Sequence, residues 1–104
     1  MIDNDRIIRE TLADHAATVA RFQDACSGII AEMAARTVEC LRGGGKICFF
    51  GNGGSAADSQ HFATEFTVRF TRNRRGLASL AFTTDTSALT ACANDFGFEA
   101  VFAR

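Results

Sequence analysis

The sequence of 104 residues contains no proline, tryptophan or tyrosine, and its formal net charge is only −1. A charge balance this close to zero gives no reason to expect a nucleic-acid or membrane partner. The apolar runs are far too short to span a bilayer, and the polar stretch from Asp3 to Arg6 is unlike a signal peptide. We therefore expect a cytoplasmic chain that forms one domain at most.

Aromatic side chains come from ten phenylalanines, whose rings pack without a polar group to satisfy. Hydrophobic residues make up 47% of the chain, which is typical of a globular protein. The cysteines lack C-x-x-C spacing, and the chain shows no secretory context for disulfides. We interpret all four as small core residues: Cys26, Cys40, Cys48 and Cys92.

A glycine-rich turn, Gly51-Asn52-Gly53-Gly54-Ser55, lies between a predicted strand and a predicted helix. Such a turn lets backbone N–H groups crowd onto a ligand, and a helix N-terminus favours an anion. Ser55 fits an N-cap, with Asp58 at the capping-box position three residues later. The turn matches neither the Walker pattern nor G-x-G-x-x-G, so the motif alone also fits an ordinary tight turn.

His61 and Glu65 lie four residues apart and therefore share one face of the helix that follows this turn. Taken singly, they fit a capped or core histidine and a solvated glutamate. Together they can hold one metal ion, although two ligands are too few for a tight zinc site. Glu65 can alternatively act as a base, because moving a proton between adjacent carbons needs a carboxylate or imidazole within hydrogen-bond reach. A phosphate cradle beside this pair predicts a site for a phosphorylated substrate.

The hydrophobic pattern predicts an α/β fold with a parallel sheet, because the first strand is apolar without alternation and so buried on both faces. A two-stranded sheet leaves both strands at an edge, which indicates a domain that is incomplete or completed by partner chains. We expect residues 1–44 to be a helical oligomerisation segment and residues 45–104 to be part of a ligand-binding domain. The expected elements are helices at 4–25, 27–41, 55–70 and 87–93, strands at 46–50 and 77–82, and a further helix near residue 98.

Three further clusters contain polar or charged residues. Thr83, Thr84 and Asp85 follow the second strand at the edge where ligands of α/β sheets collect, although Asp85 also fits a helix cap. Asn94-Asp95 fits either a helix C-terminal turn or a ligand contact. The basic residues from Arg69 to Arg75 are interpreted as a solvated loop, with phosphate capture or a subunit contact as the weaker alternatives.

The chain resembles the bacterial phosphoheptose isomerases, which have the sugar-isomerase (SIS) fold. The matching segments are residues 51–58, 60–66, 83–91 and 93–98. The resemblance implies interconversion of sedoheptulose 7-phosphate and D-glycero-D-manno-heptose 7-phosphate through an enediol, the first step towards the heptose of lipopolysaccharide. It also implies a cytoplasmic homotetramer, with one zinc per subunit that polarises the substrate carbonyl and hydroxyl.

Carried over residue by residue, the resemblance makes Glu65 the catalytic base and makes His61 and Glu65 the metal ligands. The implied substrate-binding residues are Asn52, Gly53, Gly54, Ser55, Glu65, Asn94 and Asp95. Family members are nearly twice as long, so we expect this chain to hold the N-terminal half of a flavodoxin-like, three-layer SIS domain. The serine-rich phosphate loop and the later Gln and His, which complete the zinc site and supply the second acid/base group, would then lie beyond it.

Two other classes of SIS protein remain as alternatives. One is the non-catalytic relative that binds the replication initiator DnaA; it shares the G-N-G-x-S loop and the histidine but has no glutamate at the position of Glu65. The other is a module that senses a sugar phosphate without turning it over. The presence of Glu65 favours the isomerase.

Overall fold

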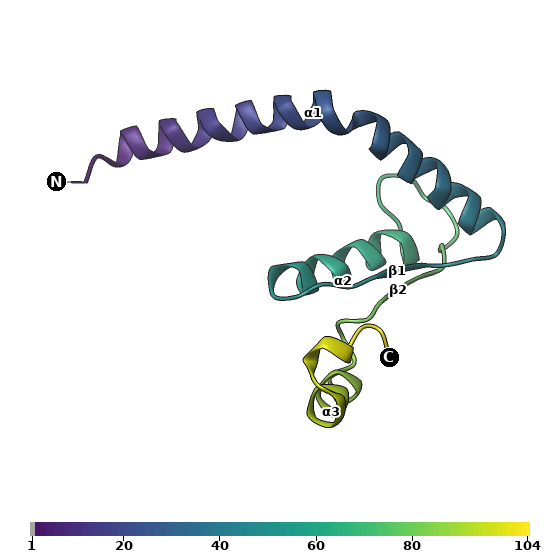
Figure 1. Cartoon of the computed structure of the whole chain (residues 1–104). Helices are drawn as coiled ribbons and strands as arrows, with labels where there is room; N and C mark the ends of the chain where they lie inside the picture. The colour runs from purple at the N-terminus through teal and green to yellow at the C-terminus, as the bar shows by residue number, and fades with distance from the viewer. Residues whose placement is uncertain (1) are drawn as a thin grey trace. The chain divides into compact units, whose positions relative to one another are not determined.

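The structure is a computed structural model that describes residues 2–104. Its elements are α1 (Asn4–Arg42), β1 (Ile47–Phe49), α2 (Gly54–Thr67), β2 (Ser79–Ala81), α3 (Thr86–Phe96) and the short 3-10 helix η1 (Phe98–Ala100) (Figure 1). The chain divides into two compact units, and the boundary lies within α1, between Arg36 and Thr37. The domain boundary expected at residues 44 and 45 stays a prediction. No helix within residues 2–104 combines the length and apolar character that a bilayer crossing requires.

The N-terminal segment is one helix of 39 residues, so the expectation of two separate helices was wrong. Ser27 and Gly28, which are weak helix formers, lie where the break was expected. However, the Ser27 hydroxyl donates a hydrogen bond back to the Gln23 carbonyl, and Gly28 does not adopt a positive φ. With no proline to remove a backbone donor, the helix continues through this region.

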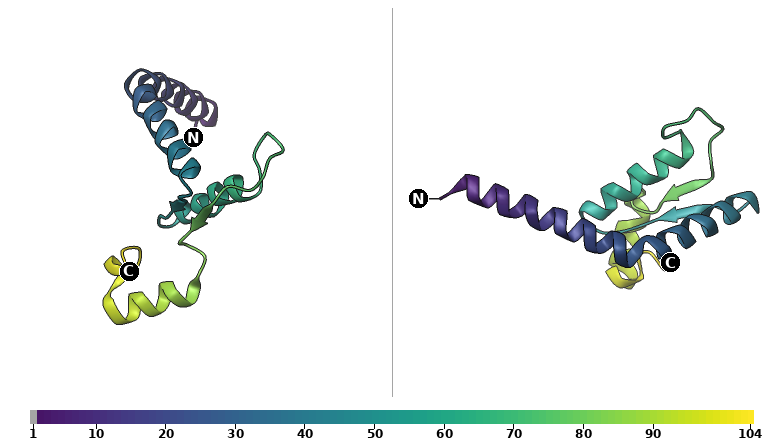
Figure 2. Two further views of the ribbon diagram at one scale, coloured as in Figure 1. Left: turned by 90° about the vertical axis from the view of Figure 1, so that its right-hand side faces the viewer. Right: turned by 90° about the horizontal axis from the view of Figure 1, so that it is seen from above.

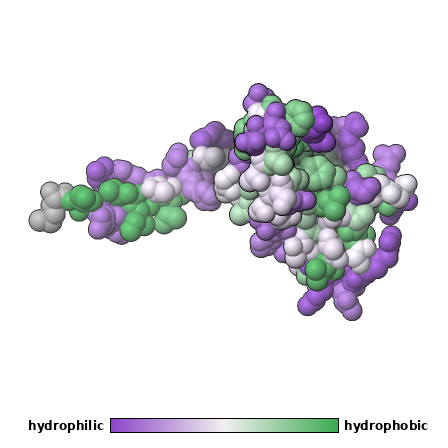
Figure 3. Space-filling model, turned by 90° about the horizontal axis from the view of Figure 1, so that it is seen from below, coloured by the Kyte–Doolittle hydropathy of each residue, from purple (hydrophilic) through white to green (hydrophobic). Residues whose placement is uncertain are grey.

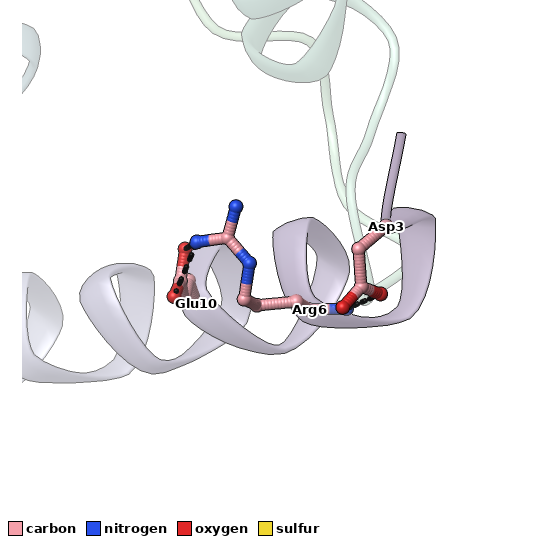
Figure 4. A network of polar contacts seen from close by, with 3 residues as sticks. All are labelled: Asp3, Arg6 and Glu10. Atoms are coloured by element: carbon pink, nitrogen blue, oxygen red, sulfur yellow. Dashed lines mark hydrogen bonds and ion pairs between the residues drawn. The ribbon is translucent and has the colours of Figure 1, made fainter. Parts of the chain in front are cut away.

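Both ends of α1 have a local cause. At the start, the Asp3 carboxylate accepts a hydrogen bond from the Arg6 amide at 3.0 Å, and the Arg6 side chain pairs with Glu10 at 3.1 Å (Figure 4). At the end, Gly44 adopts φ +82°, and the Gly45 amide donates back to the Cys40 carbonyl at 2.8 Å. The glycine run therefore ends the helix as the sequence predicted.

Within the first unit, α1 carries a seam of mainly apolar side chains at alternating intervals of four and three residues. We call it the heptad seam; it consists of Ile8, Leu12, His15, Val19, Phe22, Cys26, Ile29 and Met33. No residue of α1 is buried, and apolar atoms are visible along its surface (Figure 3). An apolar repeat averaging 3.5 residues is the pattern by which helices pair in coiled coils.

The second unit contains the expected parallel sheet, with β1 paired to β2 and Phe49 opposite Ala81. The connecting helix α2 lies along the paired strands (Figure 2). Phe49 packs against Phe62 and Phe66 of α2, with ring centroids 5.8 and 5.7 Å apart. The Ser79 hydroxyl of β2 donates to the Ala63 carbonyl of α2 at 2.7 Å. One face of the sheet is therefore covered by α2.

The other face of the sheet is open, which corrects the expectation that the first strand is buried on both sides. Cys48 is exposed, and its partner in the register, Leu80, is 48% exposed. The sheet has two strands of three residues each, and α3 packs against η1 and not against this face. The core assignment of Cys48 was therefore wrong, while the other three cysteines are half-buried free thiols.

Candidate functional site

The glycine turn links β1 to α2, and its N-cap is Gly53 with φ +58°. This conformation favours glycine, because a Cβ is strained at positive φ. The helix then begins at Gly54, so Ser55 lies inside the first turn and the N-cap expected there was wrong. Serine is a common N-cap residue, but the positive φ of Gly53, two residues before Ser55, determines where the helix starts.

Gly51 is required by a close approach within the same turn. A Cβ at this position would lie 2.7 Å from the Ser55 Cβ and 3.1 Å from the Ser55 carbonyl oxygen. On the other side, the Thr83 hydroxyl donates to the Ala56 carbonyl at 3.0 Å. The end of β2 thus holds the first turn of α2 against the sheet, at the carboxyl edge where the sequence placed Thr83.

The turn presents backbone groups that suit an anion. The Ser55 and Ala56 amides close the turn onto the Asn52 and Gly53 carbonyls, at 3.0 and 3.1 Å. The Gly54 amide donates to no acceptor within residues 2–104. It is therefore available to an oxyanion at the positive end of the helix dipole. A hollow of about 220 Å³ beside the turn is lined by Gly51, Asn52, Gly53, Ala56, Thr83, Leu89, Phe98 and Phe102.

His61 and Glu65 meet on α2 as their spacing predicted. The His61 Nε2 atom lies 2.9 Å from the Glu65 Oε1 atom. The Glu65 side chain is 29% exposed and the His61 side chain 72%, so the carboxylate is held against the protein while the imidazole faces solvent. Both line a hollow of about 380 Å³ together with Phe62, Phe66, Phe70 and Arg74.

Asn94 and Asp95 lie in the last turn of α3, as one of the two interpretations of this pair predicted. The Asn94 amide donates to the Asp95 carboxylate at 2.9 Å, and both residues are exposed. Asp85 caps the start of the same helix, where its carboxylate accepts the Ala88 amide at 2.9 Å. The cap interpretation of Asp85 is thus confirmed.

The predicted site residues do not share one pocket. The glycine turn opens onto the 220 Å³ hollow, and the His61–Glu65 pair opens onto the 380 Å³ hollow. Asp95 lines a third hollow of about 650 Å³, beside Phe96 and Asp85. The glycine turn and the His61–Glu65 pair are connected by α2, because the helix begins in the turn and carries both side chains of the pair. Their roles in binding and catalysis stay predictions.

The sequence predicts a solvated loop for the basic segment and gives Arg74 no role, but the structure shows it bonded to the end of α2. Its guanidinium is half-buried and donates to the Glu65 and Phe66 carbonyls, at 2.7 and 2.8 Å. A basic residue shortly after a predicted helix end was the available signal, because such side chains bond the last carbonyls of helices.

A metal bound by the His61–Glu65 pair would have two protein ligands among residues 2–104. Histidine nitrogen and carboxylate oxygen both bind zinc, so the chemistry of the His61–Glu65 pair fits the ion. However, residues 2–104 contain no group of three or more His, Cys, Asp and Glu side chains that could hold one. The pair alone is half of a four-coordinate site.

Comparison with known proteins places these features in a family context. The model of the SIS domain family matches residues 12–104. A phosphoheptose isomerase of Paramagnetospirillum magneticum is 52% identical over 95 residues, which cover 91% of this chain and 50% of that protein. A phosphoheptose isomerase of Campylobacter jejuni is 52% identical over 86 residues, or 83% of this chain and 46% of its own length.

Two solved structures are also similar. The phosphoheptose isomerase GmhA from Neisseria gonorrhoeae superposes with a TM-score of 0.69 at 46% identity, covering 92% of this chain and 51% of that one. A phosphoheptose isomerase from Francisella tularensis superposes with a TM-score of 0.86 at 33% identity, covering 99% and 53%. The chain thus spans about half the length of the relatives that it matches.

Proposed function

The chain belongs to the SIS domain family, and we propose that its protein is a phosphoheptose isomerase. The reaction would interconvert sedoheptulose 7-phosphate and D-glycero-D-manno-heptose 7-phosphate, at the start of heptose synthesis for lipopolysaccharide. One observation carries the proposal: in a chain about half identical to phosphoheptose isomerases, a single helix begins in an anion-suited turn and carries a hydrogen-bonded His–Glu pair.

In this proposal the glycine turn binds the substrate oxygens and phosphate. The free Gly54 amide lies at the start of the helix, where negative charge is favoured, and the exposed Ser55 follows it in the first turn. Asn52 lines the hollow beside the turn. Asn94 and Asp95, which expose polar atoms on α3, are proposed as further substrate contacts.

Glu65 is proposed as the base. Its carboxylate takes a proton from the hydroxyl-bearing carbon next to the substrate carbonyl; the C–H electron pair forms the C=C bond, and the carbonyl π pair moves onto the oxygen, which gives the enediolate. A proton then moves from the hydroxyl to this oxygen, the new carbonyl forms, and the Glu65 carboxyl returns its proton to the former carbonyl carbon, which gives the isomeric sugar. A carboxylate can serve as the base where it reaches the reacting carbon, and His61 orients that of Glu65 through a contact of 2.9 Å.

We propose that zinc is the cofactor and that His61 and Glu65 hold it. When bound, the ion would polarise the substrate carbonyl and the adjacent hydroxyl. Both side chains offer atoms that zinc accepts. The other ligands would come from residues outside the described chain or from another subunit.

We also propose that the protein is a cytoplasmic homo-oligomer, built as a tetramer on its N-terminal helices. The heptad seam of α1 supports this, because exposed apolar side chains in a 3.5-residue repeat favour helix pairing. The open face of the sheet, with Leu80 and Cys48 exposed, adds further apolar surface for another segment to cover.

A sugar-phosphate-binding module without turnover is the second candidate. It is favoured by the separation of the site residues, because the glycine turn, the His–Glu pair and Asp95 open onto three different hollows. Binding requires only the turn, whereas isomerisation requires that Glu65 reach the same sugar.

Solvent-exchange kinetics separate these candidates. The natural protein is incubated in D2O with sedoheptulose 7-phosphate, and deuterium entering the carbon next to the carbonyl is followed by NMR. Glu65→Gln should reduce exchange by about 10²–10⁴-fold, as for loss of a general base, while sugar-phosphate binding persists. Asp58→Asn, a matched loss of an exposed carboxylate on the same helix, should leave exchange unchanged. Binding without any exchange by the wild-type protein would establish the sensor instead.

A further inference from the structure

The loop that follows α2 folds back over the end of the helix that carries Glu65. The Leu77 amide donates to the Phe66 carbonyl at 3.0 Å. A Cβ on Gly76 would lie 2.6 Å from the Thr67 carbonyl oxygen, so the two backbones approach as closely as glycine allows. The last turn of α2 is therefore covered by residues that are eight to eleven positions further along the chain.

Arg74 is the side chain that closes this fold-back. One guanidinium nitrogen donates to the Phe66 carbonyl at 2.8 Å and to the Arg75 carbonyl at 2.9 Å, and the other donates to the Glu65 carbonyl at 2.7 Å. The final carbonyls of a helix lack partners within the helix, and a positive charge at that end is favourable. The guanidinium supplies both donors and charge at the residue proposed as the base.

We propose that Arg74 is a positioning residue that fixes the backbone of Glu65 and thereby directs its carboxylate toward the substrate. This role assumes the isomerase function proposed above. Glu65, His61 and Arg74 line the same hollow, and the Arg74 guanidinium bonds the Glu65 carbonyl, so Arg74 holds the backbone of the residue proposed as the base. Small errors in the placement of a reacting group reduce rates strongly.

The contacts of residue 74 with two adjacent carbonyls require arginine, and they distinguish Arg74 from the other arginines of the loop. A lysine carries one compact ammonium group, whereas the planar guanidinium spans adjacent carbonyls with two nitrogens. Arg72 belongs to the same loop and has the same charge, but its side chain is exposed. Arg72→Met is therefore a matched control, because it removes one positive charge and leaves the contacts to α2 in place.

The test compares Arg74→Met, Arg74→Lys and Arg72→Met in the natural protein. We expect Arg74→Met to lower kcat by roughly 10–100-fold with KM unchanged, because the glycine turn at the far end of α2 still binds the phosphate. Arg74→Lys should lie between Arg74→Met and the wild type. Arg72→Met should match the wild type.

Two measurements that need no turnover accompany the kinetics. The ring-nitrogen chemical shifts of His61 report the hydrogen bond to Glu65, and we expect Arg74→Met to change them. Hydrogen exchange of the Leu77 amide reports the fold-back, and it should become faster while the Ala56 amide at the other end of α2 keeps its rate. A role confined to stability would lower the melting temperature and leave kcat and the His61 signals of the folded variant unchanged.

Each outcome is decisive for one proposal. A folded Arg74→Met protein with wild-type kcat and wild-type His61 signals overturns the positioning role. If Arg74→Met does not fold, wild-type kcat in Arg74→Lys overturns it equally. A wild-type protein without isomerase activity refutes the proposed function. In that case, changed His61 signals in Arg74→Met would still show that Arg74 positions the His61–Glu65 pair. Unchanged His61 signals would refute the positioning role as well.

Discussion

Replacing Gly51 by alanine tests whether the close packing of the glycine turn is essential. The added methyl group would meet the Ser55 Cβ at 2.7 Å and the Ser55 carbonyl oxygen at 3.1 Å. Both atoms belong to the first turn of α2, which Thr83 already holds against the sheet, so no flexible side-chain end can move aside. Overpacking of this kind typically costs about 1–3 kcal/mol.

Alanine also lowers the conformational entropy of the unfolded chain, and this raises the free energy of unfolding by about 0.4–1 kcal/mol where the native backbone can accommodate alanine. The net loss of unfolding free energy for Gly51→Ala is therefore about 0–2.6 kcal/mol. Gly54→Ala is the matched control, because a Cβ there meets nothing within 4 Å and φ is not positive. That variant should gain about 0.4–1 kcal/mol.

The assay is urea unfolding of the three proteins, with the midpoint compared at equal slope. Calorimetric titration with sedoheptulose 7-phosphate should in addition show weaker binding to Gly51→Ala, since the displaced turn moves its free amide. Equal stability of the two alanine variants would refute the packing argument. Unchanged sugar-phosphate affinity in a destabilised Gly51→Ala protein would refute the link between the turn and the anion.

Three further predictions concern binding, the fold and assembly. Ser55→Ala should weaken sugar-phosphate binding by about 1.5–3 kcal/mol, as for one hydrogen bond to a charged group, and calorimetry showing equal affinity for phosphorylated and unphosphorylated sugar would contradict the cradle. Thr83→Val should lower the free energy of unfolding by about 0.5–1.5 kcal/mol through loss of its bond to the Ala56 carbonyl, a difference that urea titration detects. Phe22→Asp in the heptad seam should dissociate the oligomer in sedimentation experiments while Ala17→Asp, on the opposite side of α1, should not; a wild-type protein that sediments as a monomer would refute the assembly.

Features that depend on near neighbours in the chain were predictable from the sequence. The parallel pairing of β1 and β2 follows from two apolar strands separated by one helix. The meeting of His61 and Glu65 follows from helical periodicity alone, and the structure confirms their contact. The glycine run that ends α1 and the cap supplied by Asp85 are equally local.

The errors arose where a local preference competed with a backbone or tertiary constraint. Ser27 and Gly28 are weak helix formers at the expected break in α1, but the Ser27 hydroxyl bonds back to the preceding turn and the helix continues. Ser55 suggested an N-cap, but the positive φ of Gly53 starts the helix earlier. Arg74 gave no periodic signal, because its partners lie eight and nine residues away across a fold-back.

The second unit restrains α2 at both ends, and this bears on how one helix would serve both phosphate binding and proton transfer in the proposed reaction. At its start, Thr83 and the close-packed Gly51 hold the turn that suits a phosphate. At its end, Arg74 and Leu77 hold the carbonyls of Glu65 and Phe66. An intact helix fixes the distance between the glycine turn and Glu65, but an unrestrained last turn can fray and let Glu65 move. In the proposed reaction, restraint at both ends would therefore bring a sugar bound by its phosphate to the carboxylate in a reproducible position.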